Sequence, residues 1–111
     1  PIMHVLGVRK TLAERHPWLP GALLKAFEAS KAAALAKLEE TSATKVTLPF
    51  VAEQLKAAQE TLGENFWAYG VDASRPTLEA FARAHFEQGL SSRRVQVQKM
   101  FHPSTYEGFK I

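Results

Sequence analysis

The sequence predicts a mainly α-helical chain with three principal helices and one amino-terminal β-strand. Apolar residues recur at every third or fourth position through three long stretches, which is typical of helices that bury one face. Residues 2–8 are instead apolar with few breaks, which is typical of a strand buried on both faces of a sheet. At 111 residues, the chain 1–111 is expected to form a single segment of one domain.

The strand is expected at Ile2–Val8, and the three helices at Pro17–Glu40, Pro49–Leu62 and Arg75–Gln88. A short helical turn is expected before the first helix, at Lys10–Arg15. It stops where a proline follows, because the residue before a proline avoids the helical region.

The ends of two helices carry recognisable signals. Ser74 is expected to cap the third helix, with Pro76 in its first turn and Gly89 just after its last residue. Gly63 is expected to end the second helix in a left-handed conformation.

The stretches outside the helices are less regular. Residues 64–71 hold three aromatic side chains next to glycines, and we expect an ordered loop with its rings turned inward. Val95–Gln98 alternates like a short strand, while Val97–Phe101 fits one helical turn equally well. Pro103–Thr105 is expected to be a turn.

The predicted strand has no partner of comparable quality elsewhere in the chain. A single buried strand needs neighbouring strands on its edges. We therefore expect the chain to be one piece of a larger protein, and we expect the isolated piece to expose apolar surface and to associate with itself.

Composition and charge exclude several functions. The absence of cysteine excludes disulfides, thiolate metal sites and a thiol nucleophile. No stretch approaches the roughly 18 apolar residues of a membrane span. The formal charge is only +3, and acidic residues are interspersed with basic ones, as in the expected surface ion pair between Glu28 and Lys31. We therefore expect no nucleic-acid partner.

No metal or cofactor site is expected. The four histidines lie at positions 4, 16, 85 and 102, without the spacing of metal ligands. The sequence also lacks a Gly-rich phosphate loop and the motifs of common hydrolases.

His4 is the best catalytic candidate. An imidazole inside an apolar strand either faces a polar cleft or is a hydrogen-bonded core residue, and we weigh these alternatives evenly. Because histidine titrates near neutral pH, His4 suits proton transfer. Arg9, at the end of the same segment, suits the binding of a carboxylate, although a solvated strand end is the more common role.

Trp67 and Tyr69 are candidates for stacking on an aromatic ligand, with a core-filling loop as the more common alternative. His85 lies on the apolar side of the third expected helix, where a packed histidine is the simpler reading.

Several strings of residues resemble the carboxy-terminal third of the 4,5-dihydroxyphthalate decarboxylase family. In chain order they are PIMHVLGVRK, RHPWLPGALLKAFEASK, TLPF, LGENFWAYGV, TLEAFARAHFEQGL and FHPSTYEGFKI. The resemblance runs the length of the chain and is weakest around residues 39–45.

The resemblance implies the carboxy-terminal part of a two-lobed α/β fold like that of type II periplasmic binding proteins, in which a ligand cleft lies between the lobes. The strand that carries His4 would return from the second lobe to the first. The missing amino-terminal region would be a partner of this chain. The family's named reaction removes one carboxylate, without oxidation, from a small aromatic carboxylate, 4,5-dihydroxyphthalate, and gives protocatechuate. By residue type, His4 suits the role of the proton donor, and Arg9 suits the role of the anchor for the remaining carboxylate.

Three functions are weighed. The first is a cytoplasmic lyase of aromatic catabolism and phthalate degradation, with this piece inactive alone. The alternative is a periplasmic substrate-binding protein of an ABC-type uptake system for small organic anions, because one fold serves both roles. The third is a small helical interaction domain without a ligand. We expect the first.

Overall fold

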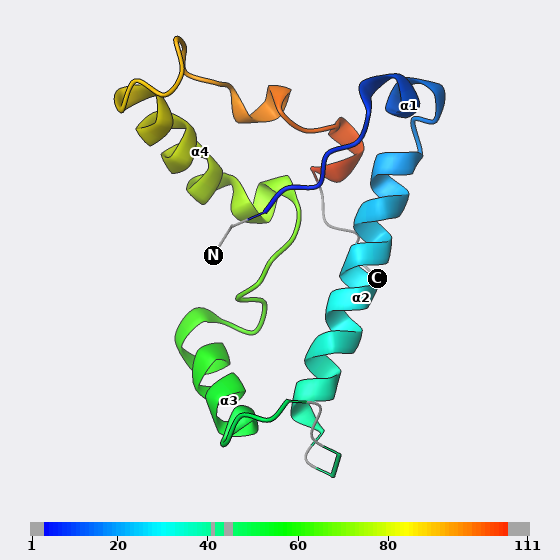
Figure 1. Cartoon of the computed structure of the whole chain (residues 1–111), viewed down its shortest axis with the longest axis vertical. Helices are drawn as coiled ribbons and strands as arrows, with labels where there is room; N and C mark the ends of the chain where they lie inside the picture. Colours follow the sequence, from blue (N-terminus) through cyan, green and yellow to red (C-terminus); the bar gives the residue numbers. More distant parts are fainter. Residues whose placement is uncertain (1–3, 41, 44–45, 107–111) are drawn as a thin grey trace. The chain divides into compact units, whose positions relative to one another are not determined.

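The computed structural model describes residues 4–40, 42–43 and 46–106 (Figure 1). Within these ranges it contains α-helices and short 3₁₀ turns but no β-strand, so the expected mainly helical fold is confirmed. The helices and turns are α1 (Lys10–Arg15), α2 (Leu19–Glu39), α3 (Val51–Leu62), α4 (Val71–Glu87), η1 (Val97–Lys99) and η2 (Pro103–Thr105).

The predicted amino-terminal strand is wrong for its described part. Residues 4–9 have no regular secondary structure, while Ile2 and Met3 lie outside the described residues. No backbone hydrogen bond joins residues 4–8 to any other described residue, and Val5 and Leu6 are 70% and 61% exposed. The physical reason is that a strand exists only by pairing with another strand, and the described chain offers none.

Three helices match the predicted positions closely, whereas α4 begins four residues earlier than expected. Gly70, not Ser74, is its N-cap, and Ser74 lies inside the helix. Pro76 is therefore an interior residue rather than a first-turn residue. The burial of Val71, which is 3% exposed, favours the earlier start. Asp72 reinforces it, because its backbone N–H donates to the Tyr106 carbonyl at 3.2 Å.

The predicted glycine stops are confirmed. Gly89 has a φ of +72°, and its N–H donates to the Phe86 carbonyl at 2.9 Å. The N–H of Leu90 donates to the His85 carbonyl at 3.0 Å. Together these two bonds form a Schellman motif, which requires a left-handed residue at the position of Gly89. Gly63 ends α3 at the predicted position with a φ of +90°, but its ψ of 160° lies outside the left-handed helical region that was expected.

The region after α4 decides between the two predictions for residues 95–101, a short strand and a helical turn. Residues 97–99 form the 3₁₀ turn η1, so the helical-turn prediction is confirmed and the strand prediction is wrong. Residues 103–105 form the turn η2, as expected.

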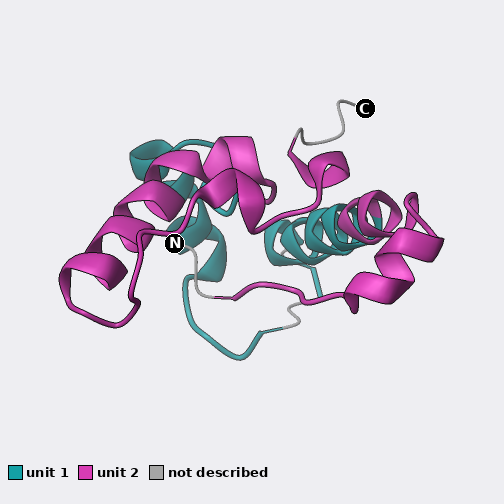
Figure 2. Cartoon of the chain, turned by 90° about the horizontal axis from the view of Figure 1, so that it is seen from above, with its two compact units in different colours: residues 1, 26–68 teal, residues 2–25, 69–111 magenta. Residues whose placement is uncertain are grey.

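The chain divides into two compact units (Figure 2), which are described separately. Unit 1 includes residues 26–68, with most of α2 and all of α3; Leu55 is its buried apolar residue. Unit 2 includes residues 2–25 and 69–111. In unit 2, α4 packs against η1, and Val71, Ala82 and Val97 form a buried cluster. Leu78, Phe101 and Tyr106 pack around this cluster.

The core is small for the apolar content of the chain. Among the described residues, the buried hydrophobic side chains are Leu55, Val71, Ala82 and Val97. Large apolar side chains that remain exposed are Val5, Leu6, Trp18, Phe27, Leu48, Phe50, Leu62, Trp67, Phe81, Phe86, Leu90 and Met100. Scattered exposed apolar residues are normal, but so many beside so small a core leave an unusually large share of the apolar side chains open to solvent.

Candidate functional site

The predicted site residues do not all belong to one unit. His4, Arg9 and Tyr69 belong to unit 2, whereas Trp67 belongs to unit 1. The candidate site is therefore described segment by segment.

His4 lies in the irregular segment before α1, and its side chain is exposed. Within the described part of the chain, no hydrogen bond or ion pair holds its imidazole. A buried, hydrogen-bonded core histidine is therefore not what the structure contains. The role of His4 as a proton donor stays a prediction.

Arg9 is the N-cap residue of α1. Its carbonyl accepts hydrogen bonds from the backbone N–H groups of Leu12 at 2.9 Å and Ala13 at 3.1 Å, which fixes the start of the helix. The exposed guanidinium has no ion-pair or hydrogen-bond partner among the described residues. Its donors are thus available for a carboxylate.

Lys31 attaches the aromatic loop 64–69 to α2. Its ammonium lies 2.7 Å from Glu28 Oε2, and it donates to the Trp67 carbonyl at 3.2 Å and to Asn65 Oδ1 at 3.4 Å. The lysine side chain is only 12% exposed and that of Glu28 29%. The pair expected on the surface therefore forms, but it is largely buried and organises a distant loop.

The rings of this loop are only partly turned inward. Trp67 is 38% exposed, while Phe66 and Tyr69 are half-buried. An indole whose backbone is held by Lys31 and whose ring is partly open to solvent has the properties of a stacking platform. Stacking on a ligand by Trp67 and Tyr69 stays a prediction.

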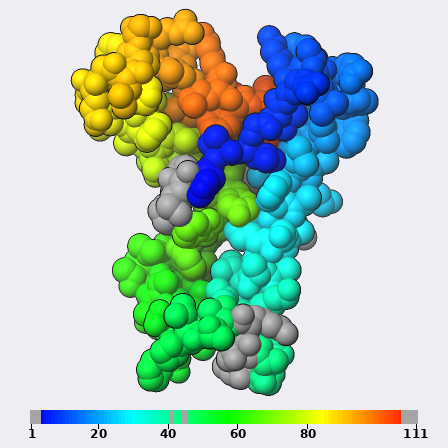
Figure 3. All heavy atoms as spheres, viewed as in Figure 1, coloured from blue at the N-terminus to red at the C-terminus, as the bar shows by residue number. Residues whose placement is uncertain are grey.

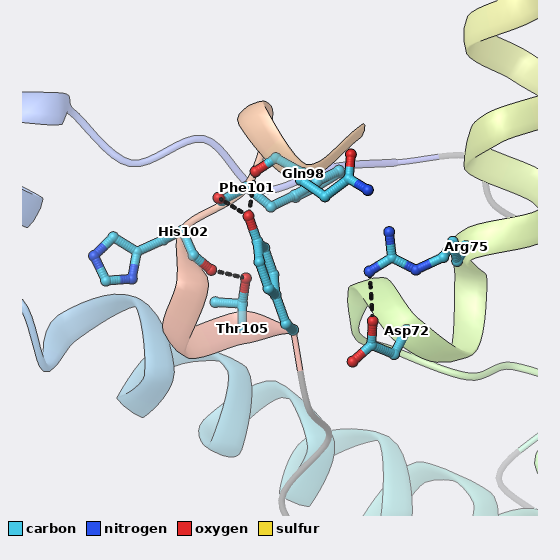
Figure 4. Close-up of polar contacts among 7 residues, drawn as sticks. Asp72, Arg75, Gln98, Phe101, His102 and Thr105 are labelled. Atoms are coloured by element: carbon cyan, nitrogen blue, oxygen red, sulfur yellow. Dashed lines mark hydrogen bonds and ion pairs between the residues drawn. The ribbon is translucent and has the colours of Figure 1, made fainter. Parts of the chain in front are cut away.

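Tyr106 closes the loop after α4 (Figure 4). Its hydroxyl donates to the carbonyls of Gln98 and of Phe101, the latter at 3.3 Å. Its own carbonyl accepts the N–H of Asp72, the residue whose carboxylate pairs with Arg75 at 2.6 Å. Residues 97–106 are thereby held against the start of α4.

His102 has a structural role that no pattern in the sequence indicates. It is the N-cap of η2, and its Nδ1 accepts the backbone N–H of Ser104 at 3.3 Å and lies 2.8 Å from the Ser104 hydroxyl. The Thr105 hydroxyl donates to the His102 carbonyl at 2.7 Å (Figure 4). Asn, Asp, Ser and Thr are the usual capping residues, so a histidine cap is hard to predict.

His85 is half-buried and hydrogen-bonded, as expected for a packed histidine. The Ser91 hydroxyl donates its proton to the Arg93 carbonyl at 2.9 Å. It must therefore accept at its oxygen from His85 Nδ1–H, 3.1 Å away. The ring also lies 5.9 Å from that of Phe81.

Within the described ranges, no group of three or more His, Cys, Asp and Glu residues is placed to hold a metal ion. None of the described helices combines the length and apolarity needed to cross a membrane.

Comparison with known proteins bears on the whole chain. No family model matches it. A 4,5-dihydroxyphthalate decarboxylase from Comamonas testosteroni is 58% identical over all 111 residues, which is 100% of this chain and 34% of that enzyme. The chain is similar to the carboxy-terminal part of this decarboxylase. The resemblance expected from the sequence is thus confirmed, over about one third of the relative's length.

The similarity to the decarboxylase covers every predicted site residue, since it runs from residue 1 to residue 111. It also covers Lys31, whose contacts to residues 34 and 36 positions away no local pattern predicts.

Proposed function

We propose that this chain is the carboxy-terminal part of a two-lobed decarboxylase that converts 4,5-dihydroxyphthalate to protocatechuate and carbon dioxide. The observation that carries the proposal is the 58% identity, without a break in coverage, to a protein of that name. The chain spans only 34% of this relative, so the activity is proposed for the longer polypeptide and not for the chain alone.

The small core of the described residues supports the proposal that a longer polypeptide, and not this chain alone, carries the activity. Val5 and Leu6 are exposed in a segment whose backbone makes no hydrogen bond within the described chain. In the proposed complete protein this segment pairs as an interior strand of one lobe, which satisfies its backbone groups and buries its side chains.

The proposed reaction needs two kinds of protein group. The bond between the ring carbon and the departing carboxylate breaks, its electron pair stays on the ring carbon, and a proton bonds to that carbon. The hydroxyl para to the departing group supplies electron density, so no cofactor is part of the proposal. A general acid delivers the proton, and a cation holds the second carboxylate.

His4 is proposed as the proton donor and Arg9 as the carboxylate anchor, with Trp67 and Tyr69 stacking on the ring. In support, the imidazole and the guanidinium are exposed and make no contact that would occupy them within the described chain. In a strand, residues five positions apart lie roughly 16 Å from each other and point to opposite faces, so one substrate contacts both only if the chain leaves the strand before Arg9. For this reason His4 is tested by itself. The proposal places the enzyme in the cytoplasm.

The test joins the 111 residues to the amino-terminal two thirds of the Comamonas testosteroni relative and measures protocatechuate and carbon dioxide released from 4,5-dihydroxyphthalate. We expect turnover by the joined protein and none by the chain alone. His4→Gln is expected to lower kcat by about 10²–10⁴, the usual contribution of a general acid. His16→Gln, at an exposed histidine before a proline, is the matched control and is expected to leave kcat unchanged.

Binding of 4,5-dihydroxyphthalate without release of carbon dioxide would contradict the proposed reaction. Full turnover by the His4→Gln variant would remove His4 from the mechanism while leaving the reaction in place.

A further inference from the structure

The face of α4 that carries its apolar residues is wider than the surface that covers it. At 100° per residue, residues 78, 81, 82, 85 and 86 fall within an arc of about 140°. Ala82 is 8% exposed and is covered by the cluster around Val97, but Phe81 is 66% exposed and Phe86 is 43% exposed. Leu90, just beyond the Schellman turn, is 66% exposed. The cluster thus covers the middle of the arc and leaves both edges open.

The open apolar residues belong to the segment drawn in yellow to orange in Figure 3, where α4 and the loop after it reach the surface. We call Phe81, Phe86 and Leu90 the open α4 face.

The charged residues of α4 itself are already paired within the chain. Asp72 pairs with Arg75 at 2.6 Å, Glu79 with Arg94 at 3.6 Å, and Arg83 with Glu87 at 3.9 Å. Every Asp, Glu, Lys and Arg of α4 therefore has a partner of opposite charge. A partner for the open α4 face consequently needs no complementary charge, which favours an apolar protein surface over a nucleic acid or an anionic membrane.

We infer that the open α4 face is the docking surface for the amino-terminal two thirds of the complete protein, and that an apolar surface of that region covers Phe81, Phe86 and Leu90. The inference rests on the proposed function, because it takes the length of the missing region from the decarboxylase of which this chain spans 34%. The face is also continuous with the Val71, Ala82 and Val97 cluster, so that docking extends an existing core.

The size of the effect follows from the exposed area of Phe81. A phenylalanine side chain of about 200 Å² that is 66% exposed offers roughly 130 Å² for burial. At about 25 cal/mol per Å², covering that area changes a binding constant by roughly 100-fold or more. An aspartate at this position would lose this area and place a charge in the contact.

The experiment mixes the complete 111-residue chain with the separately produced amino-terminal two thirds of the Comamonas testosteroni relative and measures the dissociation constant by sedimentation. The variants are Phe81→Asp and, independently, Phe86→Asp. Both sites are exposed, so we expect each variant alone to keep the wild-type helical circular dichroism. Ala80→Asp is the matched control, because Ala80 is exposed and lies about 160° around the helix from Ala82.

We expect the wild-type chain to form a one-to-one complex, and Ala80→Asp to bind within threefold of wild type. Phe81→Asp is expected to weaken the complex at least 100-fold, and Phe86→Asp, at a side chain that is only 43% exposed, at least about 30-fold. Equal binding by all four chains would overturn the inference, and so would the absence of a complex with the wild-type chain. A loss of self-association in the two Phe variants, with the complex unchanged, would assign the face to a second copy and would also overturn it.

Turnover of 4,5-dihydroxyphthalate by the complex separates this inference from the proposed function. A complex that depends on Phe81 but releases no carbon dioxide would support the docking surface and contradict the decarboxylase. A complex that turns over substrate equally well with the Phe81→Asp chain would support the decarboxylase and contradict the docking surface.

Discussion

Val97→Ala is the substitution whose effect the structure determines best. Val97 is 0% exposed and is the most deeply buried apolar residue of the described chain. It lies at the start of η1 and packs with Val71 and Ala82 of α4, so that it joins the segment after α4 to the helix itself. Its removal therefore tests whether this cluster holds unit 2 together.

The expected loss is large relative to the stability of so small a core. Two buried carbon groups contribute about 1.6 kcal/mol at about 0.8 kcal/mol each. A cavity that does not collapse adds about 1 kcal/mol. The free energy of unfolding should fall by about 2–3 kcal/mol, which is a large share of the total for a unit of this size.

The assay is urea unfolding followed by helical circular dichroism, at a protein concentration low enough for the wild-type chain to be monomeric. Val5→Ala is the matched control, because the same two carbon groups are removed from a side chain that is 70% exposed. We expect this control to change the free energy of unfolding by less than about 0.5 kcal/mol. Equal losses in the two variants would show that the cluster around Val97 does not carry the stability of unit 2.

Two further substitutions test local features. Lys31→Met is expected to release the aromatic loop and to shift the fluorescence of Trp67 to longer wavelength. Lys25→Met, at an exposed lysine of the same helix, is the control and should leave the spectrum unchanged. An unchanged spectrum in both variants would argue against the Lys31 contact. Gly89→Ala is expected to lower the free energy of unfolding by about 1–2 kcal/mol. An L-residue is strained at a φ of +72°, although nothing lies within 4 Å of the added Cβ. Gly7→Ala is the control, because its added Cβ also has no atom within 4 Å and its φ is not positive, and it should leave the free energy of unfolding unchanged. A Gly89→Ala variant as stable as Gly7→Ala would exclude the Schellman turn.

The helices could be predicted from the sequence because helical periodicity is a local signal. α1, α2 and α3 lie within two residues of their predicted bounds. The start of α4 could not be placed from the sequence, since a proline is most common in a first turn and Pro76 therefore predicts a later start. The burial of Val71 and the bond from Asp72 to Tyr106 decide that start, and both depend on residues far along the chain.

The strand prediction failed for the opposite reason. The apolar run at residues 2–8 predicts burial, but pairing is a property of two segments, and the described chain holds only one of them. Val5 and Leu6 are therefore exposed where the sequence predicts burial.

The candidate site was predictable only in part. The exposed side chains of His4 and Arg9 agree with a role toward a ligand, yet residue type and position cannot show what they face. The contacts of Lys31 to the loop 64–69 and the cap formed by His102 had no sequence signal. The first joins residues more than thirty positions apart, and the second uses an unusual capping residue.

Sedimentation of the isolated chain over a wide range of concentration shows whether another polypeptide surface covers its exposed apolar faces. We predict that the average mass rises steadily with concentration, and that adding the amino-terminal two thirds of the relative replaces these assemblies with a one-to-one complex. A chain that stays monomeric at the highest concentration would show that these faces need no other surface to cover them.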